Sequence, residues 1–172
     1  MSKADFVPLD SRVADVRTFD CGNRDITTYL RRFAAKNAAL NLNRTFVLHG
    51  KQRHNKKTSI AAFYTLAHQT LAREDLPDKR QLPRYPIPVI LLAQLGVDIN
   101  HQGQGLGSKT LVHALRNAYR IASQPHGIPA AGVILDVADF NALAFYESFE
   151  FFQPLTKNPM RLFTPMGSLA EL

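Results

Sequence analysis

The stretch "INHQGQGLGSKTLVHAL" (Ile99–Leu115) places three glycines and two glutamines directly before a segment of helical periodicity. A nearly unbroken apolar run typical of a buried strand precedes it, and apolar residues recur at helical spacing after it. Glycine lacks a side chain that would keep a ligand away, and the first turn of a helix offers unpaired N–H groups with partial positive charge. The order strand, glycine turn, helix therefore predicts an anion-binding loop.

The spacing of these glycines excludes the common nucleotide-binding loops. Gly103, Gly105 and Gly107 are each two residues apart, so the dinucleotide fingerprint G-x-G-x-x-G is absent. "GQGLGSK" also lacks the longer spacing and the Gly-Lys-Ser/Thr ending of a Walker A loop. No kinase catalytic loop follows. The loop therefore belongs to another class of anion site, at the start of a helix that we expect to span Gly105–Ser123.

The rest of the chain predicts helices around one sheet. We expect a helix in residues 19–40, with Ile26, Leu30, Phe33 and Asn37 along one face and Asn23 or Asp25 as its cap. The expected strands are residues 44–50, 59–71, 89–99 and 131–138, followed by a short helix at 141–149 and a closing hairpin at 151–165. The basic stretch "KQRHNKK" (51–57) connects two strands, and Arg73–Pro88 is rich in proline and predicts a long loop.

The composition indicates one globular domain, residues 1–172, because 45% of the residues are hydrophobic. Cys21 is the only cysteine, which excludes an internal disulfide and a thiolate cluster, and the six histidines show no metal-ligand spacing. No apolar run approaches the ~20 residues of a membrane span, and the first residues lack the apolar core of a signal peptide. We therefore expect a cytoplasmic protein without metal or membrane association.

The charge of the chain favours a polyanionic partner. Lys and Arg total 21 against 14 Asp and Glu, a formal net charge of +7. Nucleic acid, an acidic protein or a phosphorylated cofactor would each fit this balance. The net charge alone also leaves open the alternative of an ordinary basic surface without a polyanionic partner.

Two short motifs in sequence order resemble the GNAT superfamily of N-acetyltransferases. Gln102, Gly105 and Gly107 match the superfamily's Q/R-x-x-G-x-G/A loop, and "NALAFY" (141–146) is similar to its N-x-x-A-x-x-F-Y signature in Asn141, Ala144, Phe145 and Tyr146, without the two residues between Ala and Phe. The resemblance implies an α/β (α+β) GNAT fold, with a single mixed, mostly antiparallel central sheet that is flanked by helices and splayed at the acetyl-CoA-binding strand. It also implies that acetyl-CoA is the cosubstrate.

Segments outside these motifs narrow the resemblance to the GNAT toxins of bacterial type II toxin–antitoxin modules. These segments are "FDCG", "RTFVL", "AAFYTLA", "PIPVILLAQLGVD" and "LFTPMGSLAEL", and with the helix after "FDCG" they cover most of the chain from about Phe19 onward. The resemblance implies acetylation of the α-amino group of aminoacyl-tRNA, which blocks translation. It also implies neutralisation by a cognate antitoxin, of the ribbon-helix-helix DNA-binding type, and a homodimer.

The resemblance assigns roles to individual residues. Tyr146 is the expected general acid for the leaving thiolate, although on local sequence alone its aromatic neighbours would favour a core position. Asn141 is a candidate acetyl-CoA contact or helix cap. The other expected acetyl-CoA contacts are strand residues Leu95, Gly96 and Val97 and loop residues Gln102, Gly103, Gln104, Gly105, Leu106, Gly107 and Ser108. A glycine within a strand, as at position 96, predicts a bulge or a close approach.

Basic residues outside these motifs are candidates for phosphate contacts with the tRNA acceptor stem. They are Arg31, Arg32, Lys36, Arg44, Lys79, Arg80 and Arg84. Phe63 and Tyr64 could line a pocket for the aminoacyl side chain, although strand alternation places one of them in the core. Asp98 and Asp136 are the available carboxylates for a general base, and structural capping is the alternative role for both.

One residue departs from the family pattern. The superfamily usually has glycine in the left-handed position after the tyrosine helix, where this chain has Glu150. Two alternative functions stay open at this stage: a GNAT enzyme that acetylates a protein N-terminus, a lysine or a small amine, and a non-catalytic CoA-binding regulatory module. Tyr146 and the complete loop disfavour the second alternative.

Overall fold

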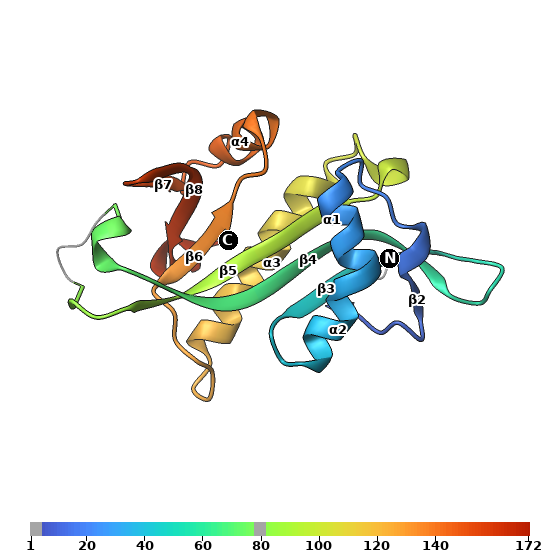
Figure 1. Ribbon diagram of the computed structural model, residues 1–172, viewed down its shortest axis with the longest axis horizontal. Coiled ribbons are helices and arrows are strands. Elements are labelled where there is room, and N and C mark those ends of the chain that lie inside the picture. The colour runs from blue at the N-terminus through green and yellow to red at the C-terminus, as the bar shows by residue number, and fades with distance from the viewer. Residues whose placement is uncertain (1–4, 78–81) are drawn as a thin grey trace. The chain divides into compact units, whose positions relative to one another are not determined.

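The computed structural model describes residues 5–77 and 82–172 (Figure 1). The chain divides into two compact units, which we describe separately. Unit 1 comprises Met1–Ala67 and Gln94–Ala114, and unit 2 comprises His68–Ala93 and Leu115–Leu172. Strands β4 (Thr58–Leu71) and β5 (Ile87–Val97) and helix α3 (Leu106–Ser123) contribute residues to both units.

The strands form one mixed sheet in the order β1-β3-β4-β5-β6-β8-β7, with β2 paired to β4. The remaining bounds are β1 (Val7–Pro8), β2 (Ala14–Asp15), β3 (Arg44–Gln52), β6 (Gly132–Asp136), β7 (Gln153–Leu155) and β8 (Asn158–Pro165). Most described strand pairs are antiparallel, and the parallel ones are β2 with β4 and β5 with β6. The expected mixed, mostly antiparallel sheet is confirmed, whereas the short strand β2 was not expected.

The first helical region differs from the expected regular helix. It runs through α1 (Arg24–Thr28), a π-helical segment η2 (Tyr29–Phe33) and α2 (Ala34–Ala39), and the Asn23 side chain caps its start as expected. A π turn places one extra residue in the helical repeat, which rotates everything after it. Ala34 is therefore buried, while Phe33 is 47% exposed. The prediction that Phe33 lies on the buried face is wrong for this reason.

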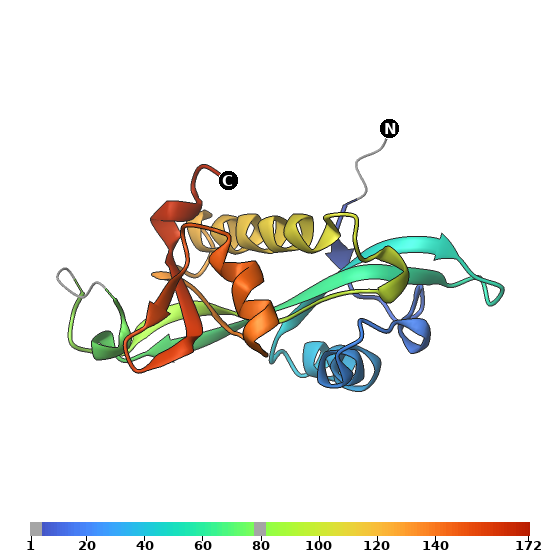
Figure 2. The same cartoon turned by 90° about the horizontal axis from the view of Figure 1, so that it is seen from above.

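In unit 1 the sheet is covered on both faces. Figure 2 shows α1 and α2 on one face of β3 and β4, and the first half of α3 on the other. A strand buried on both faces is apolar at consecutive positions, and Ile60 to Leu66 of β4 are all buried. Phe19, Leu30 and Phe63 belong to the core cluster of this unit.

Unit 2 has its own core beneath a C-terminal hairpin. Strands β7 and β8 form the expected antiparallel hairpin, and β8 also pairs antiparallel with β6. The core cluster consists of Leu71, Leu76, Ile87, Val89, Ile134, Leu155 and Phe163. The expected long loop from Arg73 onward contains a short 3₁₀ turn, Arg73–Asp75, and it ends earlier than expected because β5 begins at Ile87.

Candidate functional site

Gln102–Gly105 connect the 3₁₀ turn η4 (Ile99–His101) to helix α3 in unit 1, and together with Leu106–Ser108 of its first turn they form what we call the glycine loop (Gln102–Ser108). Gly103 and Gly105 have φ values of +78° and +74°, which L side chains rarely adopt. A Cβ atom at either position would meet nothing within 4 Å, so the conformation rather than crowding requires glycine. The loop thus leaves open space directly over its backbone, next to the unpaired N–H groups of the first turn of α3. This is a fitting cradle for a phosphorylated ligand.

The side chain of Gln102 links the glycine loop to two other segments by hydrogen bonds. Its Nε2 donates to the carbonyl oxygens of Cys21 and Val97, at 2.9 Å each. Because the carboxamide is used in this way, Gln102 offers a ligand its backbone rather than its side chain. The first residue of the sequence motif is therefore a positioning residue that ties the "FDCG" segment to the end of β5.

Gly96 is buried at the end of β5, between Leu95 and Val97. A Cβ at this position would lie 3.0 Å from Cε1 of Phe63 and 3.1 Å from Cγ2 of Ile26. The expected close approach is confirmed, and its partners are core side chains of unit 1. The described pairs of β5 with β6 extend from Ile90 to Leu92, so Leu95–Val97 follow them along the strand. That Leu95–Val97 bind the pantetheine arm stays a prediction.

Tyr146 lies in unit 2 on helix α4 (Phe140–Glu147), which we call the tyrosine helix. Its ring is half-buried, with edge-on contacts to Phe145 at 5.0 Å and Phe152 at 6.0 Å between centroids. Burial raises the pKa of Tyr146 to about 12. No residue in the described part of the chain forms a hydrogen bond with its hydroxyl. A phenol that stays protonated and has no protein partner can donate its O–H to a ligand.

Both ends of the tyrosine helix differ from the sequence expectations. The helix begins one residue earlier than expected, and its cap is Asp139, whose Oδ1 accepts from the Ala142 N–H at 2.8 Å. Asn141 is therefore not the cap but an exposed residue of the first turn, free for its other expected role as a ligand contact. At the other end, Ser148 is the C-cap and Glu150 does not adopt a positive φ. The strain expected at Glu150 is absent.

The basic residues expected to contact tRNA are distributed over several elements. Arg32, Lys36 and Arg44 are exposed on η2, α2 and the start of β3, all in unit 1. Arg31 is partly structural, since its Nε donates to the carbonyl oxygen of Phe19 at 2.8 Å. Arg84 is exposed in unit 2. Lys79 and Arg80 lie outside the described residues.

Phe63 and Tyr64 do not line an open pocket, which corrects one expectation. Both are fully buried, because β4 is covered on both faces of unit 1. Tyr64 also stacks on Phe46, with ring centroids 5.1 Å apart, and its hydroxyl lies 3.2 Å from Nδ1 of His113. These two residues are therefore part of the core.

The two carboxylates considered as general bases have structural partners. Asp98 is buried and accepts the backbone N–H groups of Asp20 and Asn100, each at 3.1 Å. Asp136 forms an ion pair with Arg161, with 2.8 Å between Oδ1 and Nε. The capping role is confirmed for Asp98, which caps η4, whereas Asp136 forms an exposed ion pair and caps no described helix. Over the described ranges, no three His, Cys, Asp or Glu side chains group as ligands for a metal ion, and no helix is long and apolar enough to cross a membrane.

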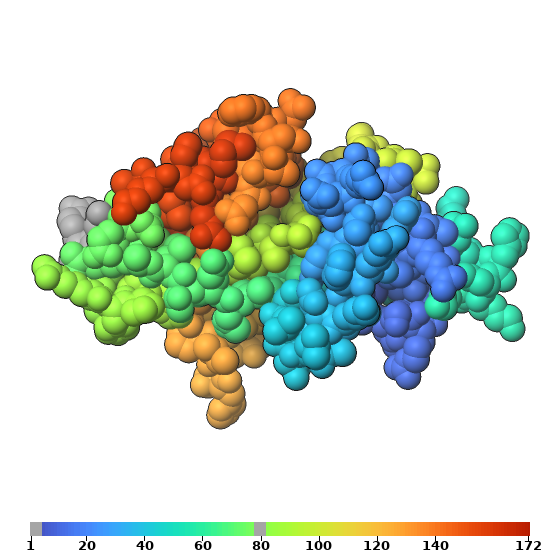
Figure 3. All heavy atoms as spheres, viewed as in Figure 1, coloured from blue at the N-terminus to red at the C-terminus, as the bar shows by residue number. Residues whose placement is uncertain are grey.

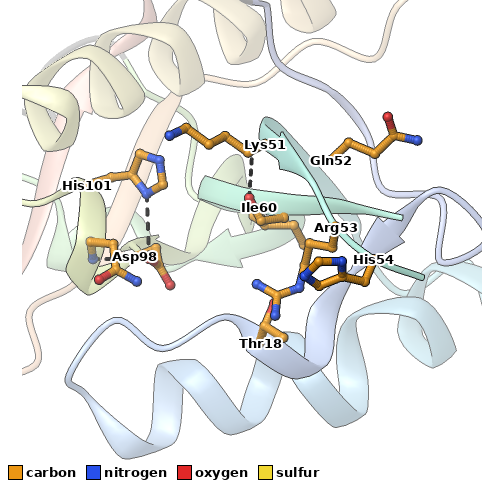
Figure 4. A pocket seen from close by; sticks show the side chains of 10 residues that line it. Thr18, Lys51, Gln52, Arg53, His54, Ile60, Asp98 and His101 are labelled. Atoms are coloured by element: carbon orange, nitrogen blue, oxygen red, sulfur yellow. Dashed lines mark hydrogen bonds and ion pairs between the residues drawn. The ribbon is translucent and has the colours of Figure 1, made fainter. Parts of the chain in front are cut away.

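The basic stretch 51–57 of unit 1, expected only to connect two strands, also lines a cavity. The turn end of the β3–β4 hairpin lines an open cavity of about 590 Å³ together with η1 (Val16–Thr18) and η4, which we call the anion cavity (Figure 4). Lys51, Arg53 and His101 are among its lining residues. The signal for it was present in "KQRHNKK", where four of seven residues are Lys or Arg.

The chain is similar to known toxins along most of its length. It is 35% identical over 140 residues to the "tRNA-acetylating toxin" of Mycobacterium tuberculosis, which covers 80% of this chain and 78% of that protein. It is 27% identical over 175 residues to the "Probable toxin TacT" of Sinorhizobium fredii, over 96% and 92% of the two chains. No family model matches the chain.

Solved structures of the toxin AtaT share the fold. The complex AtaTR with acetyl-CoA has a TM-score of 0.78 at 25% identity, over 96% of this chain and 95% of that one. AtaT with acetyl-methionyl-tRNAfMet has a TM-score of 0.81 at 24% identity, over 96% and 97%. A tyrosine-to-phenylalanine mutant of AtaT, bound to the C-terminus of the antitoxin AtaR, has a TM-score of 0.77 at 23% identity, over 96% and 94%. The expected fold is confirmed.

Proposed function

This chain belongs to the GNAT toxins of toxin–antitoxin modules, and we propose that it transfers the acetyl group of acetyl-CoA to the α-amino group of an aminoacyl-tRNA. The observation that carries this proposal is the relationship to a tRNA-acetylating toxin over most of both chains. An N-acetylated aminoacyl-tRNA has no free amine to form the next peptide bond, so translation stops. The substrate is charged tRNA, which places the reaction in the cytoplasm.

The glycine loop supplies the site for the pyrophosphate of acetyl-CoA. The backbone N–H groups of Gln102–Ser108 and the positive end of the α3 dipole bind the two phosphates. The open space above Gly103 and Gly105 supports this role, because it lets the phosphates approach the backbone closely. Leu95, Gly96 and Val97 would offer main-chain groups to the amides of the pantetheine arm, as a strand edge does to a peptide. Asn141 is exposed and available as a further contact.

Tyr146 stabilises the sulfur that leaves during the reaction. The amine nitrogen forms a bond to the acetyl carbonyl carbon, the bond from that carbon to sulfur breaks, and the sulfur departs with the electron pair as a thiolate. With a pKa of about 12, the Tyr146 phenol is a weaker acid than a thiol of pKa ~8.5. Its contribution is therefore a hydrogen bond to the developing negative charge, and the thiolate takes a proton afterwards or remains an anion.

The acceptor amine needs no dedicated carboxylate base. Asp98 and Asp136 are engaged in structural contacts, as described above. The α-amino group of an aminoacyl ester is less basic than a lysine, so a large fraction is neutral near pH 7 to 8. Water can accept the proton that the nitrogen loses after the attack. The reaction then depends on the position of the amine, which the tRNA contacts provide.

The partners follow from the toxin assignment. Arg31, Arg32, Lys36, Arg44 and Arg84 provide candidate phosphate contacts for the acceptor stem, and the net charge of +7 supports a polyanionic substrate. An antitoxin would neutralise the enzyme, as a ribbon-helix-helix protein that binds operator DNA. The active toxin would be a homodimer.

The decisive experiment incubates the purified protein with radiolabelled acetyl-CoA and a set of charged tRNAs. The product is digested with nuclease, and the terminal nucleoside is analysed for an N-acetylated aminoacyl ester. We expect the label on the aminoacyl ester of one or a few tRNAs. Label found only on free amines or on protein lysines and N-termini would contradict the proposal. Binding of acetyl-CoA without transfer to any acceptor would identify a non-catalytic module instead.

A further inference from the structure

The anion cavity is lined by more cationic than anionic side chains. Figure 4 shows Lys51 and His101 on one side of it, and Arg53 and His54 on another. Within the described chain, no carboxylate lies at ion-pair distance from Lys51. Arg53 is 45% exposed and has only a 3.5 Å contact between its Nε and Oδ2 of Asp15. Two cations thus face a cavity that contains little opposite charge.

The one carboxylate of the cavity, Asp98, is already satisfied by backbone N–H groups. Its two oxygens each accept one of them, from Asp20 and Asn100, at 3.1 Å. Oδ2 also lies 3.5 Å from Nδ1 of His101, a buried nitrogen that otherwise has no hydrogen-bond partner. Asp98 brings one formal negative charge to the lining, against the two formal positive charges of Lys51 and Arg53.

The backbone of β3 is shaped so that Lys51 faces this cavity. The register between β3 and β4 shifts on both sides of His49, which is the mark of a bulge, and bulges re-aim side chains. Beside the bulge, the Lys51 N–H donates to Oγ of Ser59 at 3.0 Å. A Cβ at Gly50 would lie 2.5 Å from that same oxygen, so glycine is required for this close packing. These contacts fix the backbone at Lys51, next to the cavity.

The cationic surface continues beyond the cavity along the turn of the hairpin. Lys56 is exposed there with a φ of +65°, and the Lys57 ammonium donates to the Ser11 carbonyl oxygen. In Figure 3 this turn, drawn in teal, stands out from the rest of unit 1. One phosphate group would need only the cavity, whereas a row of cations along a protruding turn fits several phosphates in succession.

We propose that the anion cavity and the adjoining turn bind the phosphate backbone of an RNA strand, with Lys51 and Arg53 as the principal contacts. This inference rests on the proposed function, since the RNA would be the charged tRNA whose amine is acetylated. The site differs from the glycine loop in the groups that would bind phosphate: the cavity uses side-chain cations, whereas the loop uses backbone N–H groups. Its role is to position the tRNA and not to read its sequence.

The test compares two double variants of the protein that remove the same charge. The first is Lys51→Gln with Arg53→Gln in the cavity. The control is Lys157→Gln with Arg12→Gln, at exposed positions elsewhere on the surface. It also removes one lysine and one arginine, and this arginine likewise contacts an aspartate. Binding of uncharged tRNA is measured by filter binding from low to high salt. The KM values for charged tRNA and for acetyl-CoA are measured separately.

We expect the cavity variant to bind uncharged tRNA more weakly and with a salt slope reduced by roughly 0.7 to 0.9 for each phosphate that is no longer neutralised. Its KM for charged tRNA should rise about three- to tenfold, with the KM for acetyl-CoA unchanged. Behaviour equal to that of the control would overturn the inference. So would a higher KM for acetyl-CoA with normal tRNA binding, which would assign the cavity to a phosphate of that cosubstrate. Weaker binding of an acidic peptide alone would likewise overturn it.

Failure of the proposed function would be seen separately. If the parent protein acetylates no aminoacyl ester, the toxin assignment fails at that step. The binding assay with uncharged tRNA still decides the inference, because it requires no chemistry. Circular dichroism melts of both double variants show whether each is still folded, and Lys51→Gln alone, at an exposed side chain without an ion-pair partner, repeats the test if Arg53→Gln destabilises η1 through Asp15.

Discussion

The glycine loop and the tyrosine helix provide chemistry in opposite ways. The loop offers backbone N–H groups, it is largely exposed, and its shape depends on positive φ values at Gly103 and Gly105. The tyrosine helix offers one side-chain hydroxyl, and aromatic neighbours such as Phe145 and Phe152 surround its ring. In the loop, the proposed role depends on backbone conformation. In the helix, the proposed role depends on a single side-chain oxygen.

The largest effect is expected at the oxygen itself. Tyr146→Phe keeps the ring and its contacts but removes the hydrogen bond to the leaving sulfur. We expect kcat to fall about 10²- to 10³-fold, as for the loss of one hydrogen-bond donor to developing charge, with the Kd for acetyl-CoA within a factor of about three. Single-turnover acetyl transfer and calorimetric titration with acetyl-CoA measure the two quantities.

Tyr85→Phe is the matched control for this prediction. Tyr85 is 64% exposed in unit 2, so removing the same oxygen there should leave kcat unchanged. Growth arrest on expression should disappear for Tyr146→Phe and persist for Tyr85→Phe. A Tyr146→Phe protein that remains as toxic as its parent would remove Tyr146 from the mechanism.

A smaller effect is expected from the conformation of the loop. Gly105→Ala forces an L residue to a φ of +74°, at a cost of about 1–2 kcal/mol. A free loop that relaxes to relieve this strain must regain it on binding, which corresponds to roughly a 5- to 30-fold rise in the KM for acetyl-CoA. Gly167→Ala is the control, because a Cβ there also meets open space but no positive φ is involved. Equal KM values for the two variants would mean that the positive φ of the loop is not needed for binding.

The hydrogen bonds that link the loop to two other segments are expected to contribute less. Gln102→Glu replaces the amide that donates to the Cys21 and Val97 carbonyl oxygens by a carboxylate that cannot donate. We expect the free energy of unfolding to fall by about 1 kcal/mol, seen as a decrease in Tm of about 2–4 °C. Gln104→Glu adds the same charge to an exposed neighbour in the loop and should leave Tm unchanged. A similar decrease in both would attribute the effect to charge alone.

The smallest effect is expected from alkaline pH. Because burial raises the pKa of Tyr146 to about 12, only about 1% of this phenol would be ionised at pH 10, where an ordinary tyrosine is half ionised. The tyrosinate absorbance difference between the parent and Tyr146→Phe should therefore be nearly flat from pH 8 to 10. A difference titration with a midpoint near pH 10 would show that Tyr146 is solvated like a surface tyrosine.

The strengths and errors of the sequence predictions have physical causes. The strands, the glycine loop and helix α3 were predictable because apolar periodicity and glycine spacing are local properties. The burial of Phe33 was wrong because the π turn at Tyr29–Phe33 shifts the helical phase by one residue. The cap at Asn141 was wrong because Asp139, two residues earlier, reaches the free N–H of Ala142. The pocket role of Phe63 and Tyr64 was wrong because helices cover both faces of β4.

The sequence by itself determined the class of fold, the glycine turn before helix α3 and the tyrosine as a candidate, because each depends on residues that are neighbours in the chain. Only the tertiary structure decided what residues distant in sequence do together. It tied Gln102 to Cys21, packed Gly96 against Ile26 and Phe63, and turned a basic connection into one wall of a cavity with Asp98 and His101. Such contacts depend on how strands and helices pack, and packing leaves no periodic signal in a single sequence.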